Sequence, residues 1–143
     1  MLYLVSKKPG STLWSGDPRV QADINRWLFW NASNWGPACG IFIFEHLVKK
    51  FTNQGAPDPD EIKKGEEQFH RFAAILDDHL KGRDWLVGNN VTLADYSVGS
   101  LLDLAEMAHM PVEKYQNIRH WYQNIEKLDA WKKSAPANFM KKQ

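Results

Sequence analysis

Residues 85–96 read Trp-Leu-Val-Gly-Asn-Asn-Val-Thr-Leu-Ala-Asp-Tyr, and this stretch decides the fold. Its second half predicts the start of a helix. The side chain of Thr92 can accept a hydrogen bond from an amide of the first helical turn, and the carboxylate of Asp95 can reach back to the amide of Thr92. We expect this helix to continue to about Ala108 and to be broken at Pro111.

Upstream of this stretch, a long helical pattern runs as far as Phe51. Asp17-Pro18 predicts its start, because aspartate is a good N-cap and proline fits the first helical position. Gly36-Pro37 predicts a kink in its middle, because proline removes a backbone hydrogen bond. Its side chains form two stripes at helical spacing. The stripe expected to face the core holds Ile24, Trp27, Leu28, Trp35, Phe42 and Leu47, and the second stripe holds Trp30, Ser33, Asn34, Pro37, Ile41 and Phe44.

The rest of the chain is also helical in pattern. A linker at 53–58 ends the long helix, and a second amphipathic helix is expected from about residue 59 until Gly82 stops it. A last amphipathic helix covers 118–128, followed by a short turn at 130–133. No segment alternates like a strand for more than a few residues. The sequence therefore predicts an all-α bundle of about five helices with a long kinked first helix.

The composition excludes several classes of protein. The chain has 143 residues, enough for one domain, and a net charge of +1 without a basic block, so a nucleic-acid partner is not expected. Its single cysteine, Cys39, excludes an internal disulfide and is consistent with a reducing compartment. No run of about 18 apolar residues is present, so a membrane span is not expected. We expect a cytoplasmic location.

The order Gly88, Thr92, Ala94, Asp95 resembles the G-x-x-x-[TS]-x-A-D signature that opens the sixth helix of glutathione transferases. Other segments are similar to this family in the same order. Residues 17–28 resemble the start of its fourth helix, residues 117–122 its seventh helix, and residues 130–133 its closing turn. Residues 2–7 are similar to the end of its third helix, and the bacterial members look most similar.

This resemblance implies a division of the chain. Residues 1–11 would be a remnant of the preceding domain's last helix and a linker, and residues 12–143 would form a helical domain like the C-terminal domain of glutathione transferases. The thioredoxin-like domain that activates the glutathione thiol in this family would be absent. We therefore assign no catalytic residue, and we expect the chain alone to bind no cofactor and to be inactive. Glutathione would be the co-substrate of the intact protein.

The resemblance also implies candidate binding residues on the second stripe. In this family, that part of the fourth helix contacts glutathione or lines the pocket for the electrophilic substrate. The candidate set is Trp30, Ser33, Asn34, Gly36, Pro37 and Phe44. The alternative is that the same face only packs against the absent domain. Both interpretations predict an exposed apolar surface on this chain.

Other polar residues are interpreted structurally. Cys39 is expected to be a packed core thiol, because no His or Lys lies near it in sequence to lower its pKa. Asn31 is expected to be a buried, hydrogen-bonded asparagine, and Asp95 a capping residue rather than a catalytic acid. The histidines do not show the spacing of metal ligands, so no metal is expected.

Two functions are therefore open. The chain can supply pocket and dimer-interface surface in an intact glutathione-conjugating enzyme, with a homodimer or the absent thioredoxin-like domain as its partner. Alternatively, it is a helical protein-interaction module without catalysis.

Overall fold

The computed structural model describes residues 11–134, and this part of the chain contains helices and no strand. The expected all-α bundle is confirmed. The expected remnant at residues 1–11 lies outside the described part except for Ser11. The helical segments, in chain order, are α2 (Pro18–Trp30), η1 (Asn31–Trp35), α3 (Gly36–Ile43), η2 (Phe44–Val48), α4 (Lys49–Thr52), α5 (Pro59–Leu80), α6 (Leu93–Gly99), η3 (Leu102–Leu104), η4 (Val112–Lys114), α7 (Gln116–Glu126) and α8 (Asp129–Ser134).

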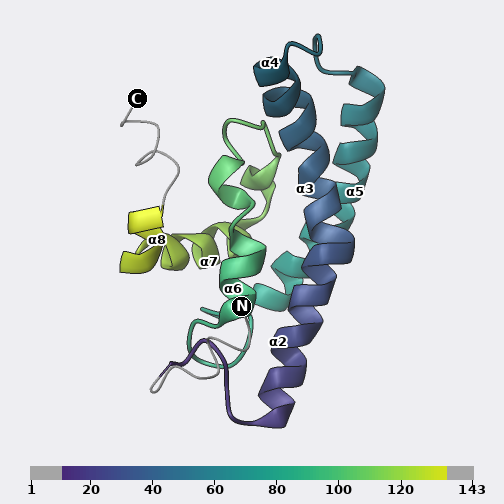
Figure 1. Cartoon of the computed structure of the whole chain (residues 1–143). Coiled ribbons are helices and arrows are strands. Elements are labelled where there is room, and N and C mark those ends of the chain that lie inside the picture. Colours follow the sequence, from purple (N-terminus) through teal and green to yellow (C-terminus); the bar gives the residue numbers. More distant parts are fainter. Residues whose placement is uncertain (1–10, 135–143) are drawn as a thin grey trace.

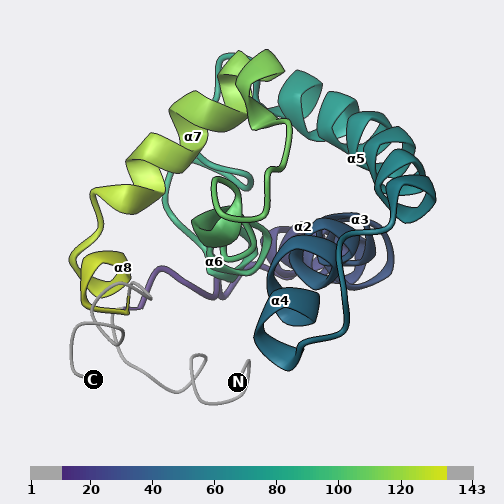
Figure 2. The same ribbon diagram turned by 90° about the horizontal axis from the view of Figure 1, so that it is seen from above.

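The segments from α2 to α4 follow one another without a break and form the long helix, which α5 follows back along its side (Figure 1). Seen from above, α6 lies in the middle, with the long helix, α5 and α7 around it (Figure 2). The buried apolar side chains form one cluster to which the long helix, α5, α6 and α7 all contribute, and the buried residues of α6 include Leu93, Ala94, Val98 and Gly99. The central helix is thus the one whose start the sequence marks most clearly.

The start of the long helix and the start of α5 are built in the same way. Asp17 accepts a hydrogen bond from the amide of Arg19 at 2.8 Å, with Pro18 at the first helical position. Asp58 accepts one from the amide of Asp60 at 2.9 Å, again with a proline next in the chain. The predicted N-cap Asp17 and the predicted start of the second helix at about residue 59 are therefore confirmed, and Asp58 caps that second helix.

At Gly36-Pro37, where a kink is expected, the structure has a π-helical turn, η1, just before these two residues. The amide of Gly36 donates to the carbonyl of Asn31, five residues back. A Cβ on Gly36 would lie 2.8 Å from that carbonyl oxygen, so this position accepts only glycine without rearrangement. A second π turn, η2, follows α3 and was not expected from the sequence. Each turn adds one residue to the helix and rotates the side chains that follow it.

A buried carboxylate at the end of the long helix was also unexpected. Glu45, which is 4% exposed, accepts a hydrogen bond from the amide of Asp58 at 2.7 Å and one from Nζ of Lys49 at 2.6 Å. These two donors hold the pKa of Glu45 below its ordinary value, with the amide of Asp58 the stronger influence. Glu45 thereby joins the end of the long helix to the start of α5.

The capping box at the start of α6 is confirmed and serves more than the helix. The carboxylate of Asp95 accepts from the amide of Thr92 at 2.8 Å, from the amide of Leu86 at 2.8 Å and from Nε1 of Trp121 at 2.9 Å. Thr92 in turn accepts from the amide of Ala94. One fully buried side chain therefore links the loop before α6, the start of α6 and α7.

The α-helical part of α6 is shorter than expected. It ends at Gly99 and is followed by turns and the short 3₁₀ helix η3. The prediction of a continuous helix to about Ala108 was therefore wrong. A Cβ on Gly99 would lie 2.8 Å from Cδ1 of Ile125, so this glycine lets α6 and α7 approach closely. Glycine is also a weak helix former, which fits an end at this position.

The start of α7 is capped by a side chain from another helix. Asp77 of α5 accepts hydrogen bonds from the amides of Asn117 and Ile118 at 2.9 and 3.0 Å, and from Nδ2 of Asn117 at 2.8 Å. These donors are among the amides that a helix start leaves without partners. The cap therefore fixes where α7 begins on α5.

Replacing Asp77 by alanine is expected to destabilise the protein by about 1–3 kcal/mol, because amides at the start of α7 lose a charged acceptor. Hydrogen exchange of the amides at 116–118 should speed up as well. Asp78 is the matched control, since this neighbour is exposed and its replacement by alanine should change neither quantity. Equal effects of the two substitutions in urea unfolding and in exchange would contradict the role of Asp77.

Candidate functional site

The long helix carries an exposed face in its middle part, between residues 29 and 44. Phe29, Ser33, Pro37 and Phe44 are all exposed, and we call these four residues the outer face. Phe29 is 73% exposed and Phe44 is 43% exposed. Large aromatic side chains in water at such positions typically mark a surface that another protein segment covers. Three of these four residues belong to the candidate set named from the sequence.

Ser33 and Asn34 lie at the middle of this region. The hydroxyl of Ser33 donates to the carbonyl of Phe29 at 2.8 Å and lies 3.2 Å from Oδ1 of Asn34. Ser33 is exposed, and Asn34 is half-buried. The hydroxyl oxygen of Ser33 and the amide group of Asn34 thus form a small polar spot between Phe29 and Pro37.

Trp30 does not lie on the outer face, where its position in the second stripe would place it. Its ring is half-buried and stacks on Trp35 with 5.9 Å between ring centroids, and it meets Phe72 of α5 edge-on at 6.2 Å. Trp27 contacts it from the other side at 5.1 Å. The structure therefore places Trp30 in the contact between α2 and α5, whereas Phe44 lies on the outer face. The π turn η1 stands between the two residues and rotates them apart.

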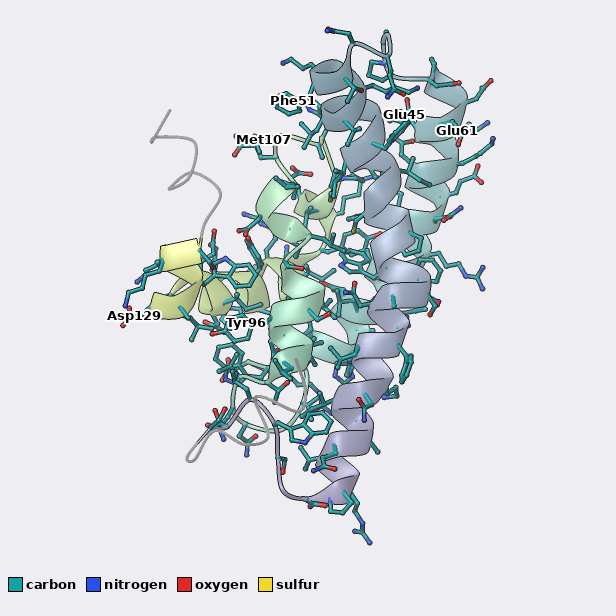
Figure 3. The ribbon with its side chains drawn as sticks, in the orientation of Figure 1. Glu45, Phe51, Glu61, Tyr96, Met107 and Asp129 are labelled. Atoms are coloured by element: carbon teal, nitrogen blue, oxygen red, sulfur yellow. The ribbon has the colours of Figure 1, made fainter. Side chains whose placement is uncertain are left out.

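Two exposed aromatic residues were missed from the sequence. Phe29 follows the spacing of Ser33 and Pro37, four residues apart each time, and this spacing could have found it. Phe51 is 75% exposed at the end of the long helix, and Met107 in the loop after η3 is 44% exposed. Figure 3 shows Phe51 and Met107 at the same end of the molecule.

The residues interpreted structurally lie as expected, with one exception. Cys39 is fully buried, and burial raises the pKa of its thiol. Nδ2 of Asn31 donates to the carbonyl and the hydroxyl of Ser97 at 3.1 and 3.0 Å. Oδ1 of Asn31 is buried and accepts no hydrogen bond from residues 11–134, so this asparagine is only partly satisfied. Burial raises the pKa of Asp95, and the donors from Leu86, Trp121 and Thr92 oppose that effect.

Neither a metal site nor a membrane span is found in the described part of the chain. Residues 11–134 contain no group of three or more His, Cys, Asp or Glu side chains arranged to hold a metal ion. Within the same residues, no helix has the length and apolarity needed to cross a bilayer.

A family model described as the C-terminal domain of glutathione S-transferase matches residues 37–129. The chain belongs to the glutathione S-transferase family. The matched residues include α5, α6 and α7, and with them the hydrogen bonds by which Asp95 joins the loop before α6, the start of α6 and α7.

Similar proteins come from bacteria and animals. FtsZ-localized protein A of Caulobacter vibrioides is 26% identical over 85% of this chain and 58% of its own length. Glutathione S-transferase D6 of Drosophila melanogaster is 26% identical over 90% of this chain and 56% of its own length. A crystal structure of a glutathione S-transferase from Rhodospirillum rubrum has the same fold, with a TM-score of 0.81 and 24% identity over 90% of this chain and 59% of its own. The chain thus spans less than three-fifths of the length of each of these relatives.

Two histidines join the long helix of this glutathione S-transferase domain to the loop after η3. The ring centroids of His46 and His109 lie 4.8 Å apart, and the angle between the two ring planes is 67°. His109 has a positive φ of 56°, a backbone conformation that residues other than glycine seldom adopt. Burial lowers the pKa of His46, the neighbouring His109 lowers it further, and Glu45 opposes both.

We therefore expect this domain to lose stability as the pH falls from about 7 towards 5. The unfolded chain binds the proton of His46 near its ordinary pKa of 6.5, whereas the folded chain binds it only at a lower pH. The stability contributed by neutral His46 is complete above that value, and it is lost as the pH falls to the folded pKa. Replacing His46 by glutamine should reduce the slope of unfolding free energy against pH. Replacing the exposed His120 by glutamine should leave the slope of unfolding free energy against pH unchanged. Equal slopes for the two variants would contradict the prediction.

Proposed function

We propose that this domain works as the helical half of an intact, cytoplasmic glutathione transferase-like protein, with its outer face turned towards a thioredoxin-like half. The observation that carries this proposal is the outer face itself. Phe29 and Phe44 are exposed to solvent, at 73% and 43%, on the long helix of a domain whose residues 37–129 match the family model. The relatives are longer by about the size of one further small domain. A second half is the partner that a surface of this kind would require.

In that arrangement, the domain supplies binding surface rather than catalytic groups. Ser33, Asn34, Gly36, Pro37 and Phe44 would line the pocket for the electrophilic substrate or the contact with the other half. Trp30 would support this surface from the contact with α5. The glutathione thiolate, held by the thioredoxin-like half, would attack an electrophilic carbon of the substrate. Part of the same surface would also form a homodimer contact.

The first test uses the chain alone. With glutathione and chlorodinitrobenzene, the pure chain should give no turnover above the uncatalysed rate. Turnover that disappears when an outer-face residue is mutated would overturn the division of roles.

The second test joins the thioredoxin-like half of the R. rubrum enzyme to the N-terminus of this chain. The fusion should conjugate glutathione to chlorodinitrobenzene, and Phe44→Asp should lower its kcat/KM about tenfold or more, the size of one lost apolar contact. Ile75→Ser is the matched control, because Ile75 is an exposed apolar residue of α5 outside the outer face. Equal kcat/KM for both variants would contradict a pocket at the outer face.

A second candidate function is a protein-interaction module without catalysis. It is favoured by the similarity to FtsZ-localized protein A, whose name describes a location with another protein rather than a reaction. A fusion that folds and binds glutathione but conjugates nothing would favour this candidate. The outer-face variants should then weaken binding to a protein partner instead of turnover.

A further inference from the structure

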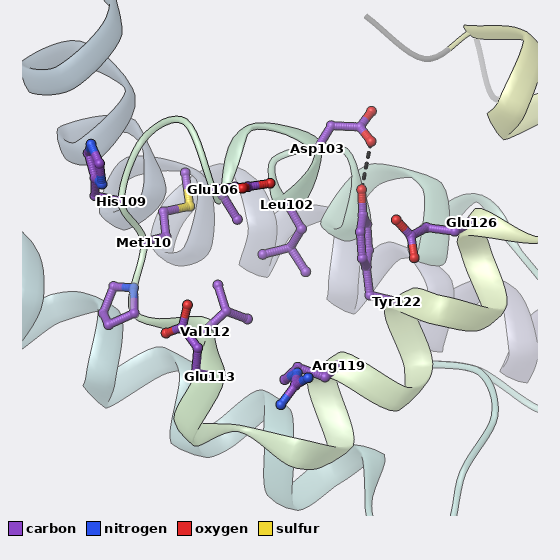
Figure 4. Close-up of a pocket in the computed structure, with 12 residues that line it drawn as sticks. Leu102, Asp103, Glu106, His109, Met110, Val112, Glu113, Arg119, Tyr122 and Glu126 are labelled. Atoms are coloured by element: carbon purple, nitrogen blue, oxygen red, sulfur yellow. Dashed lines mark hydrogen bonds between the residues drawn. The ribbon is translucent and has the colours of Figure 1, made fainter. Parts of the chain in front are cut away.

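A cavity of about 810 Å³ lies away from the outer face, between the loop after α6 and the helix α7 (Figure 4). Its walls come from η3, the loop at 105–111, η4 and one side of α7. None of the outer-face residues lines it. The proposed function therefore gives this cavity no role.

The interior of the cavity is apolar, and its rim is acidic. Leu102 and Met110 are buried and Val112 is half-buried, and Figure 4 shows Leu102 and Val112 in the interior. Carboxylates from η3, the loop, η4 and α7 stand around them, against one arginine, Arg119, and one histidine, His109. The acidic residues are Asp103, Glu106, Glu113 and Glu126.

An aromatic ring lies among these carboxylates. The hydroxyl of Tyr122 donates to Oδ1 of Asp103 at 2.6 Å, and Nε1 of Trp131 donates to the same oxygen at 3.2 Å. The rings of Trp131 and Tyr122 also meet edge-on, with 6.1 Å between their centroids. Glu126 follows Tyr122 by about one turn of α7, so both side chains lie on the same face of that helix and line the cavity. One ring and two carboxylates are thus brought together on one side of the cavity.

The negative charge of the rim is not offset by ion pairs in the described part of the chain. Glu106, Glu113 and Glu126 are exposed, and none of them makes an ion pair with another residue in 11–134. The carboxylates also do not converge as a metal ion requires, because residues 11–134 hold no group of three or more His, Cys, Asp or Glu side chains with that arrangement. Negative charge spread around an apolar interior instead suits a large organic cation.

We propose that this cavity binds organic cations with an apolar body, such as amines that carry an aryl or alkyl group. The cationic group lies against the ring of Tyr122, beside the carboxylates of Asp103 and Glu126, because aromatic rings and carboxylates both attract such cations. The apolar body lies on Leu102 and Val112, where it leaves water. An anion of similar shape is repelled by the rim, so the site selects its ligands by charge.

A fluorescence titration of the full chain with berberine tests the proposal. Berberine is a flat aromatic cation without an acidic group, and its emission rises when it leaves water. The chain should bind it saturably, and phenylbutylamine, which is protonated at pH 7, should displace it. Phenylbutyrate has nearly the same aryl-alkyl body with a negative charge, and it should not displace berberine. The absence of saturable binding, or equal displacement by the amine and the acid, would overturn the proposal.

Substitutions that keep the side-chain shape test the role of the rim. Glu106→Gln with Glu126→Gln should weaken berberine binding about fivefold or more, because two negative charges beside the cation are removed. The matched control is Glu66→Gln with Glu67→Gln, which makes the same change of charge at exposed positions of α5 outside the cavity. The control should leave the Kd unchanged. Equal Kd values for the two double variants would show that only the overall charge of the chain attracts berberine, and would overturn the proposal.

A blocking substitution tests the place of the apolar body. Ala105 is half-buried and lines the cavity, whereas Ala74 is exposed on α5. Ala105→Trp should fill part of the cavity and weaken berberine binding at least tenfold, and Ala74→Trp should not change it. Circular dichroism verifies that the helices of each variant are intact, and the glutamine variants decide the question if Ala105→Trp does not fold. An unchanged Kd in folded Ala105→Trp would overturn the proposal.

Discussion

Replacing Asp95 by alanine is expected to cost about 3–5 kcal/mol of unfolding free energy. The substitution leaves three buried N–H groups without an acceptor, namely the amides of Leu86 and Thr92 and Nε1 of Trp121. Each belongs to a different segment, so the loss affects the loop before α6, the start of α6 and the position of α7 together. Urea unfolding followed by circular dichroism measures the change.

Asp23→Ala is the control for this prediction. Asp23 pairs with Arg26 at the surface of α2, where an exposed ion pair contributes at most about 1 kcal/mol. A loss below about 1 kcal/mol for Asp95→Ala would show that water satisfies the three donors and that Asp95 does not hold the segments together. The loss of unfolding free energy for Asp95→Asn should lie between those for Asp95→Ala and Asp23→Ala. The asparagine side chain still accepts hydrogen bonds at its oxygen, but its NH₂ group donates where the carboxylate accepted.

Replacing Trp35 by alanine is expected to destabilise the domain by about 3–5 kcal/mol, because a fully buried indole leaves a large cavity. Trp35 stacks on Trp30, contacts Phe69 with 5.0 Å between ring centroids, and donates from Nε1 to the carbonyl of Val98 at 3.2 Å. The indole therefore packs against α2 and α5 and also bonds to α6. The same urea titration measures the loss.

Two further variants separate the contributions of Trp35. Trp35→Phe keeps most of the aromatic area and removes the hydrogen bond to Val98, so it should cost about 1–2 kcal/mol. Phe29→Ala removes an aromatic ring of the same helix that is mostly exposed, and it should change stability by about 0.5 kcal/mol or less. Equal effects of Trp35→Ala and Phe29→Ala would contradict the packing described for α2, α5 and α6.

The elements that could be predicted are those whose signals are local in the sequence. Asp17-Pro18, Asp58-Pro59 and Thr92 with Asp95 mark helix starts through contacts between residues two or three apart. Such contacts depend on few other residues, so the pattern is sufficient. The length of α6 was not predictable in the same way, because Gly99 ends it where α7 requires close packing, and that contact is distant in sequence.

The long-range contacts were not visible in the sequence. The cap that Asp77 provides for α7 joins residues forty apart, and nothing near either residue indicates it. The hydrogen bond that the amide of Asp58 donates to the carboxylate of Glu45 depends on the path of the linker between them. The i, i+4 spacing of Glu45 and Lys49 predicts only their ion pair.

The candidate site was predictable to the same limited extent. The common face of Ser33, Pro37 and Phe44 was expected from helical spacing, and its exposure was expected because the domain that would cover it is absent. All three residues are exposed. Trp30 was grouped with them because the residues of the second stripe are three or four apart, the spacing of a regular α-helix. The π turn at Asn31–Trp35 changes the angle between Trp30 and the residues after it, and a residue count cannot reveal a turn of this kind.

The π turn η1 also lets the part of the long helix after it change in evolution independently of the part before it. One added residue in a helix rotates every later side chain by about 100° around the helix axis. A π turn accommodates the added residue within one wide turn, so the helix on either side of it stays regular. Removing one residue from 31–35 would therefore bring different side chains into contact with a partner, while the part of the helix before residue 31 kept its contacts. Gain or loss of such a residue offers this lineage a way to alter what its helix recognises in one mutational step.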